Sequence, residues 1–528
     1  MINNKKNVYH AEWFVLSMIL LFALLLRLYF FVGASIEDDL GFTGNAYDYY
    51  RGLWTAGNDQ SMRRLTYIPI GILYSICGGM GAFSTHAYHI LCGLVTIASA
   101  FLISRMLFGF QAAIFSAIFL TVIPIHIIYS TRIMPSLPET AWGGISILLL
   151  CVIERRNQKG ISCFSNLIYL FIGILIGMAY LCRETGIIFM GVPFIYFGML
   201  MILKCNFSDT IKHALLVISG FSIIFVLESY LNFCLSGDWL CRWHIVKEAQ
   251  KVYGPPWDFY IKALLNLQHF SFAIDNNNWQ NVFNNFSNII FYSKYNSPLG
   301  VMGIFILFSS ICYCIKTRGI GSIIIIWFLS YFLFLSFGSS SLNTYMPIRK
   351  FHRYEILFLT PASIICGWLM SILYKHRYFK PIVVLLCSLI VISNLYYTFY
   401  LHIKYAAYKK GAKEVHKMIQ SNADPNIPIF LDSFECAILD YFDGYQSIYR
   451  YTMSNSFFCD KHKGVYVVAT KNQHGKYMSE FQNKQCLTTI PNSWIKIADV
   501  ELGYWEYFKP GLRPVLYYIP LLESKNKE

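Results

Sequence analysis

Three consecutive acidic residues, Glu37, Asp38 and Asp39, follow the first long apolar run of the chain. An acid cluster at a membrane face is stable while it stays solvated, and it repels the anionic lipid surface beside it. Placed at the start of a large loop, it could bind a cation or abstract a proton.

A second acid and several cations recur in later polar stretches that the topology below places on the same side. They are Arg132, Glu139, Arg183, Lys350, His352 and Arg353. A carboxylate can take the proton of an acceptor hydroxyl. Cations can hold a phosphate and stabilise the charge that develops as it leaves. Asp38, Asp39 and Glu139 could also hold a hard divalent metal ion.

The composition indicates an integral membrane protein. Hydrophobic residues make up 56% of the chain, charged residues 14%, and the mean hydropathy is +0.46; soluble domains carry about 25% charged residues. The net charge of +14 is explained first by cytoplasmic Lys and Arg that set topology, and second by attraction to anionic lipid or a phosphate-bearing substrate. The chain has no nucleic-acid motif, so we expect no nucleic-acid partner.

Apolar runs of roughly spanning length predict eleven transmembrane helices, the first of them a retained signal anchor. They are Trp13–Phe31, His86–Ser104, Ala112–Tyr129, Pro138–Ile153, Leu167–Tyr180, Gly186–Leu203, Ala214–Phe233, Leu299–Ile315, Ile320–Phe337, Ile356–Leu373 and Pro381–Tyr400.

The run Tyr67–Gly81 is apolar but short, and whether it spans decides the side of every later loop. If it does not span, the short inner loops hold eleven Lys and Arg and the outer loops five, as the positive-inside rule requires. We therefore expect this run to lie along or re-enter the outer face. The amino end is then cytoplasmic, and the outer side receives loops 32–85, 130–137, 235–298 and 338–354 and the carboxyl end.

The polar tail predicts a small α/β domain outside the cytoplasm, residues 402–528, after a membrane domain of residues 1–401. Its predicted elements are a helix at Lys409–Ser421 and strands at Ile427–Asp432, Val465–Thr470, Trp494–Ala498 and Val515–Ile519. If the tail lies outside the cytosol, Cys436, Cys459 and Cys486 allow one disulfide whose pairing the spacing does not decide.

Four stretches together resemble the GT-C class of polytopic glycosyltransferases, in the branch of protein O-mannosyltransferases and the lipid A aminoarabinose transferase. They are Asp38-Asp39-Leu40-Gly41-Phe42 with Ala46, Arg105-Met106-Leu107-Phe108-Gly109 with Pro124, Glu139 at a helix start, and Arg353 to Pro361. Their order and sidedness agree with the family from residue 12 to about residue 400. Asp39 stands where the family usually has Glu, and Phe42 where it usually has Tyr.

The resemblance implies an all-α polytopic membrane bundle with an accessory outer domain, and an inverting transfer of a sugar from a polyprenyl-phosphate donor to a hydroxyl on a lipid, a cell-surface glycan or a protein. Asp38 would be the base on the acceptor side, next to Asp39, and Glu139 its supporting acid. Arg353, with Lys350 or His352, would contact the lipid phosphate, with Arg183 and Arg132 as further cations. In a bacterium the protein would lie in the inner membrane.

Simpler explanations compete with these roles. Glu139 could be an acid favoured by the helix dipole, and Arg132 and Arg183 could only snorkel. Glu228 lies within an apolar run, where a partner in the bundle would satisfy it. The alternative function is a transporter or flippase of lipid-linked saccharides, which would need polar residues at mid-membrane and often a repeated half; Arg27 and Glu228 are the few candidates, and no repeat is visible. A non-catalytic assembly protein is a third alternative.

Overall fold

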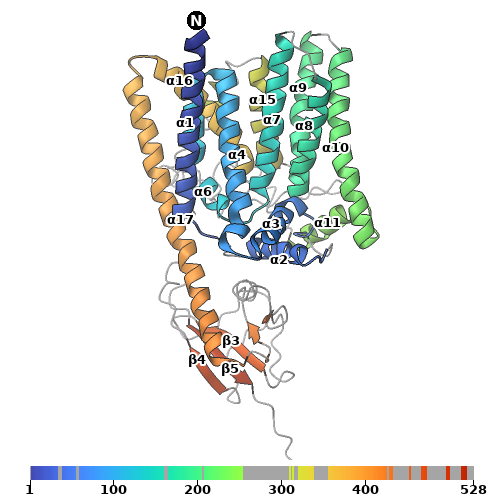
Figure 1. Ribbon diagram of the computed structural model, residues 1–528, viewed down its shortest axis with the longest axis vertical. Coiled ribbons are helices and arrows are strands. Elements are labelled where there is room, and N and C mark those ends of the chain that lie inside the picture. Colours follow the sequence, from blue (N-terminus) through green and yellow to red (C-terminus); the bar gives the residue numbers. More distant parts are fainter. Residues whose placement is uncertain are drawn as a thin grey trace, which may run out of the picture.

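The structure, a computed structural model (Figure 1), describes most of the chain up to residue 424 and parts of the tail. The described residues are 2–33, 38–54, 59–159, 165–204, 207–253, 309–310, 312–313, 319–337, 355–424, 427, 429–431, 451–453, 465–471, 495–499 and 513–519.

The described part is mostly helical. The helices are α1 (Ile2–Tyr29), α2 (Asp38–Tyr50), α3 (Arg64–Cys77), α4 (Ala82–Phe108), α5 (Phe110–Val122), α6 (Pro124–Ser130), α7 (Ser136–Gln158), α8 (Ser165–Cys182), η1 (Glu184–Ile187), α9 (Ile188–Lys204), α10 (Phe207–Ser236), α11 (Cys241–Tyr253), η2 (Gly319–Gly321), α15 (Ser322–Phe337), α16 (Ile356–Lys375) and α17 (Lys380–Asn422).

Seven described helices are long and apolar enough to cross a membrane, and an eighth span is formed if α5 and α6, bent by 64° at Ile123, count as one. The predicted runs Leu167–Tyr180 and Ile320–Phe337 fall on shorter apolar helices, and most of Leu299–Ile315 lies outside the described residues. A polytopic helical membrane protein is thus confirmed, and the count of eleven stays a prediction.

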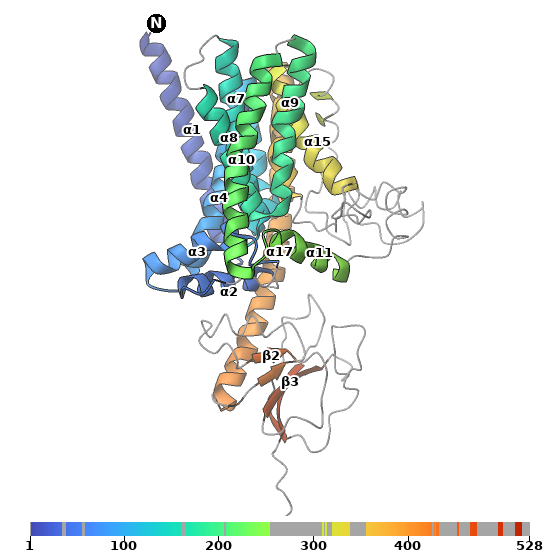
Figure 2. The ribbon, with the colours of Figure 1, turned by 90° about the vertical axis from the view of Figure 1, so that its right-hand side faces the viewer.

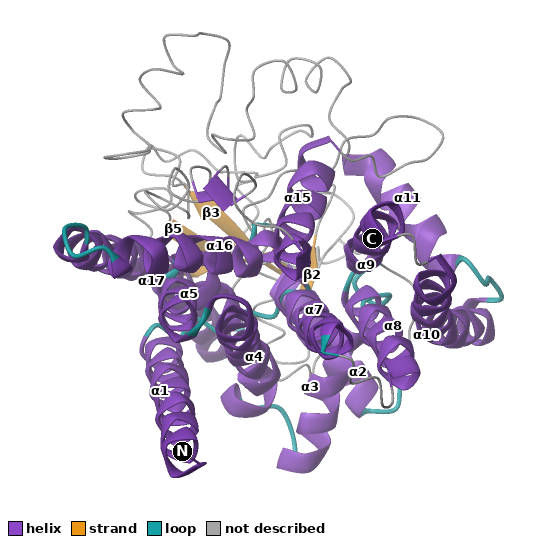
Figure 3. Ribbon diagram, turned by 90° about the horizontal axis from the view of Figure 1, so that it is seen from above, coloured by secondary structure: helices purple, strands orange, loops and turns teal. Residues whose placement is uncertain are grey.

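Helix α16 is the most buried of the candidate spans among the described helices: 89% of its apolar stretch is buried, against 17% for α10 and 22% for α1. It packs against α4, α5, α7 and α15, and the end-on view in Figure 3 shows it beside α5 and α15. The close contact with α5 depends on Gly367, because a Cβ there would lie 2.1 Å from Ser116 Oγ. Dispersion between such tightly packed helices stabilises the bundle, since lipid is as apolar as the core.

Helices α2, α3 and α11 gather at one end of the bundle, and the amino terminus lies at the opposite end (Figures 1 and 2). Helix α3, the segment predicted not to span, has 14 residues. At 1.5 Å per residue it covers about 21 Å, less than the roughly 30 Å hydrocarbon core.

The tail contributes a five-stranded sheet in the order β2-β1-β3-β5-β4. Its strands are β1 (Ile429–Leu431), β2 (Tyr451–Met453), β3 (Val465–Lys471), β4 (Ile495–Asp499) and β5 (Arg513–Ile519). Strand β1 pairs in parallel with β2 and β3, and β5 pairs antiparallel with β3 and β4. The four predicted strands are present, and the short β2 is additional.

Helix α17 runs without a break across the predicted domain boundary at residue 401, so the sheet is joined to the bundle by a continuous helix (Figure 1). The predicted separate helix Lys409–Ser421 is the end of α17. Cys436, Cys459 and Cys486 lie outside the described residues. So do the part of loop 235–298 after Tyr253 and the whole of loop 338–354.

Candidate functional site

The segment Thr131–Glu139, made of the connection between α6 and α7 and the first turn of α7, links the two acidic regions that the sequence singled out. At its start Thr131 Oγ1 accepts a hydrogen bond from Val32 N at 3.3 Å, just before the first acidic loop. Its next residue, Arg132, pairs with Asp39, and its last residue, Glu139, bonds to Thr185. One short segment therefore holds Arg132 and Glu139 and contacts Asp39, at the end of the bundle that carries α2 and α3.

Helix α2 begins at Asp38 and Asp39, where the dipole of the first turn favours negative charge. Asp39 is fully buried, and its Oδ2 lies 2.7 Å from Arg132 Nε. Its backbone carbonyl accepts a hydrogen bond from Thr43 Oγ1 at 2.6 Å. The side chain of Asp38 lies outside what the structure describes.

Arg132 is held by aromatic rings as well as by Asp39. Its guanidinium lies 5.2 Å from the ring centroid of Tyr129 and 5.1 Å from that of Tyr405, and Nη1 lies 3.4 Å from the Tyr405 hydroxyl. Burial alone would lower the pKa of Arg132, but the Asp39 carboxylate raises it above its usual value. In this structure Arg132 is committed to Asp39, and its predicted contact with a phosphate stays a prediction.

The position of α2 is fixed by apolar packing on α3 and on the connecting segment. Phe42 of α2, Tyr67 and Tyr74 of α3, and Ile133 share one buried cluster. Gly71 lets the helices approach, because a Cβ there would lie 2.8 Å from the Ala46 carbonyl. The packing of α2 and α3 on Ile133 thus places Asp39 beside Arg132.

Glu139 lies in the first turn of α7, as predicted, and is fully buried. Its Oε1 accepts hydrogen bonds from Thr185 Oγ1 at 2.7 Å and from the Tyr331 hydroxyl at 3.1 Å. Among the described residues, Oε2 has no hydrogen-bond partner. A buried carboxylate needs such donors to stay in place, so the two hydroxyls fix this side chain.

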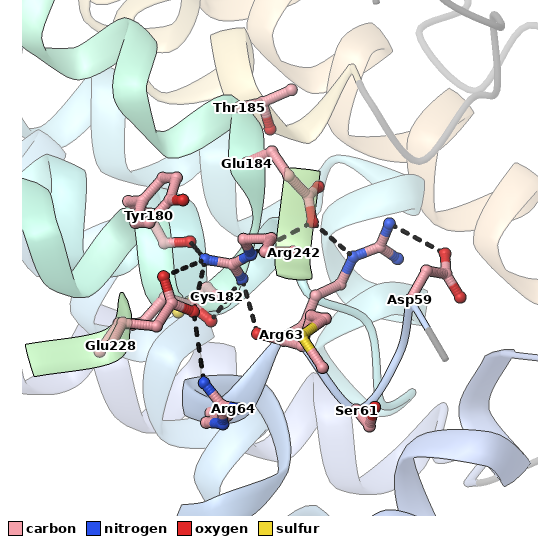
Figure 4. Close-up of polar contacts among 12 residues, drawn as sticks. Asp59, Ser61, Arg63, Arg64, Tyr180, Cys182, Glu184, Thr185, Glu228 and Arg242 are labelled. Carbon is pink, nitrogen blue, oxygen red and sulfur yellow. Dashed lines mark hydrogen bonds and ion pairs between the residues drawn. The ribbon is translucent and has the colours of Figure 1, made fainter. Parts of the chain in front are cut away.

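A second cluster of charges lies next to this site (Figure 4). Arg242 of α11 contacts Glu228 at 2.9 Å and Glu184 at 3.6 Å, and Arg64 contacts Glu228 at 3.7 Å. Arg63 bridges Glu184 at 3.5 Å. Glu228, which the sequence flagged, therefore has partners within the bundle, as its simpler explanation required.

The two clusters meet at consecutive residues at the start of η1. Arg183 Nη1 donates to Ser136 Oγ at 3.3 Å, Glu184 joins the charge cluster, and Thr185 bonds to Glu139. Tyr331, Thr185 and Arg242 were not predicted as site residues. Tyr331 and Thr185 lie in or beside apolar runs, and Arg242 lies in a long polar loop, so no spacing marks them.

The structure does not describe the remaining predicted cations. Lys350, His352 and Arg353 lie outside the described residues. Among the residues that the structure describes, no three His, Cys, Asp or Glu side chains are grouped closely enough to hold a metal ion.

Comparison with known proteins gives a family for the central segment and a fold for the chain. Residues 66–229 match the family model described as dolichyl-phosphate-mannose-protein mannosyltransferase. This segment contains Arg132, Glu139, Arg183 and Glu228. No curated protein matches the chain by sequence.

Two solved membrane proteins have a similar fold. ArnT from Cupriavidus metallidurans bound to undecaprenyl phosphate has a TM-score of 0.56 at 12% identity, over 95% of this chain and 97% of that chain. Archaeal oligosaccharyltransferase AglB from Archaeoglobus fulgidus, in complex with an inhibitory peptide and a dolichol-phosphate, has a TM-score of 0.52 at 11% identity, over 90% of this chain and 75% of that chain. The central segment is thus similar to a mannosyltransferase family, and the chain shares the fold of these two polytopic membrane proteins.

Proposed function

We propose that the chain transfers a sugar from a polyprenyl-phosphate donor to a hydroxyl acceptor at the end of the bundle that carries α2, α3 and α11. The observation that carries the proposal is the pair of fully buried acids, Asp39 and Glu139, joined through the segment Thr131–Glu139. The undecaprenyl phosphate and dolichol-phosphate bound by structures of this fold support a donor of the same class. This end faces outward in the proposed topology.

In the proposed reaction Asp38 takes the proton of the acceptor hydroxyl as its oxygen bonds to the anomeric carbon. The bond from that carbon to the phosphate oxygen breaks on the opposite face, so the configuration inverts. The electron pair leaves with the phosphate, which needs no strong general acid. Arg353, Lys350, His352 and Arg183 are the proposed cations that stabilise its charge.

Asp39 and Glu139 have distinct proposed roles. Asp39, paired with Arg132, holds the first turn of α2 in place and so orients the adjacent Asp38. Glu139 supports the base from the start of α7. The acceptor is a lipid, a surface glycan or a protein.

The substitution Asp38→Asn tests the proposal, because the amide keeps the size of the side chain but cannot take the proton. We expect the protein to reach normal levels in membranes and transfer to fall by at least about 100-fold. Asp48→Asn, on the same helix, is the matched control and should keep full transfer. Mass spectrometry of surface glycans in cells that carry each variant measures the product and identifies the acceptor; full transfer with Asp38→Asn rejects the assignment.

A further inference from the structure

Helix α17 carries two polar residues beyond its membrane span that reach the candidate site. The span ends at Ile403, and Tyr405 and Lys409 follow it one helical turn apart. Residues four apart share a face of a helix. Tyr405 contacts Arg132 through its ring and its hydroxyl, and Lys409 Nζ donates to the Val32 carbonyl at 3.3 Å.

The contact of Lys409 depends on a close approach to the chain before α2. Gly33 has a φ of +75°, and a Cβ there would lie 2.7 Å from Lys409 Nζ. The ammonium also lies over the Phe31 ring, 6.0 Å from its centroid. Burial and the neighbouring Lys413 lower the pKa of Lys409, and the Asp39 carboxylate opposes this shift.

We propose that Tyr405 and Lys409 are positioning residues for the Asp39–Arg132 pair. The face of α17 that carries them then packs against the end of the bundle where the reaction is proposed. This inference rests on the proposed function of that end. The rings of Tyr129 and Tyr405 both contact the guanidinium, and its ion pair with Asp39 holds the first turn of α2. Lys409 fixes the chain just before that turn from the same helix face.

The expected consequence is kinetic. Without the Tyr405 ring, the Arg132 guanidinium has more freedom to rotate. The first turn of α2, which carries Asp38 and Asp39, is then held less firmly by its ion pair with Arg132. Since a shift of 1 Å in a catalytic group costs up to about 100-fold in rate, we expect Tyr405→Ala and Lys409→Met each to lower kcat about tenfold. The KM for the donor should change less than about twofold, because neither residue is proposed to bind it.

The transfer assay uses the full chain in lipid nanodiscs and the lipid-linked donor extracted from the producing cells. Tyr378→Ala and Lys417→Met, which alter an exposed tyrosine beyond the other end of the span and an exposed lysine two turns further along α17, are the matched controls. Tyr405→Phe keeps the ring over Arg132 and should retain most of the rate. Equal kcat for Tyr405→Ala, Lys409→Met and the two controls overturns the inference.

A second readout does not need activity. Thermal unfolding of the same samples gives a double-mutant cycle between Lys409→Met and Asp39→Asn. Coupling predicts that the Tm shift of Lys409→Met becomes smaller in the Asp39→Asn background. If the Tm shifts are coupled but the wild-type chain transfers no sugar, the proposed function is wrong and the contact between α17 and the Asp39 region remains. If the Tm shifts of the two substitutions are additive and the wild-type chain transfers sugar normally, the positioning role is wrong.

Discussion

At the scale of single residues, the surroundings of Asp39 set the role that its carboxylate can have. Asp39 is fully buried and bonded to a guanidinium, which stabilises its charged form and makes it a poor base. Asp38 opens α2 directly beside it. The pairing of Asp39 therefore supports the choice of Asp38 as the base and gives Asp39 a holding role.

The Asp39–Arg132 pair should be stabilising only while both partners are present. Arg132→Gln leaves a buried carboxylate without its cation, which costs about 3–5 kcal/mol of stability. Adding Asp39→Asn removes that carboxylate and should recover most of the loss. Thermal unfolding of the purified variants measures both effects, and a double variant no more stable than Arg132→Gln would contradict the pairing.

A substitution at Glu139 can distinguish a catalytic role from the simpler explanation that this acid is favoured only by the helix dipole. Glu139→Gln keeps an acceptor for Thr185 and Tyr331, so stability should fall by no more than about 1 kcal/mol. The catalytic role predicts loss of transfer in this folded variant. Near-normal glycan product, measured by mass spectrometry, would leave only the helix-start explanation.

At the scale of elements, the charge cluster fixes α11 to the rest of the bundle. Arg242 of α11 bridges Glu228 of α10 and Glu184 of η1. Arg242→Met should therefore release α11 and raise amide hydrogen exchange in Cys241–Tyr253, while the first turns of α10 stay protected. Lys247→Met, on the same helix, is the control; unchanged exchange with Arg242→Met would show that apolar contacts alone hold α11.

The elements were largely predictable, and their pairing was not. Apolar runs marked the long helices, and β-branched and aromatic residues marked four of the five strands, because both patterns are local. Asp39 and Arg132 lie 93 positions apart, and their contact depends on the 64° bend after α5 and on the packing of Ile133. Arg132 thus looked like a free cation, and Tyr405 like a residue after a span.

At the scale of the molecule, α17 joins the sheet to the candidate site through one continuous helix. Upstream, Tyr405 contacts Arg132 and Lys409 contacts Val32. Downstream, the helix buries Val415, Met418 and Ile419, and it also contacts β4. These two sets of contacts are separated by only a few residues. The helix can therefore be interrupted on either side of Lys409 to separate their roles.

A flexible Gly-Ser-Gly-Ser insertion between Ile403 and Lys404 should detach Tyr405 and Lys409 from the span and lower transfer about tenfold or more. The same insertion between Lys413 and Glu414 leaves both contacts intact and frees only the sheet. If the sheet acts solely through α17, transfer in this second variant should stay within about twofold of wild type. Glycan mass spectrometry, normalised to protein level, compares the two insertions. A large loss of transfer only in the variant with the insertion between Lys413 and Glu414 would mean that the sheet must be held next to the site, either to cover it or to bind the acceptor.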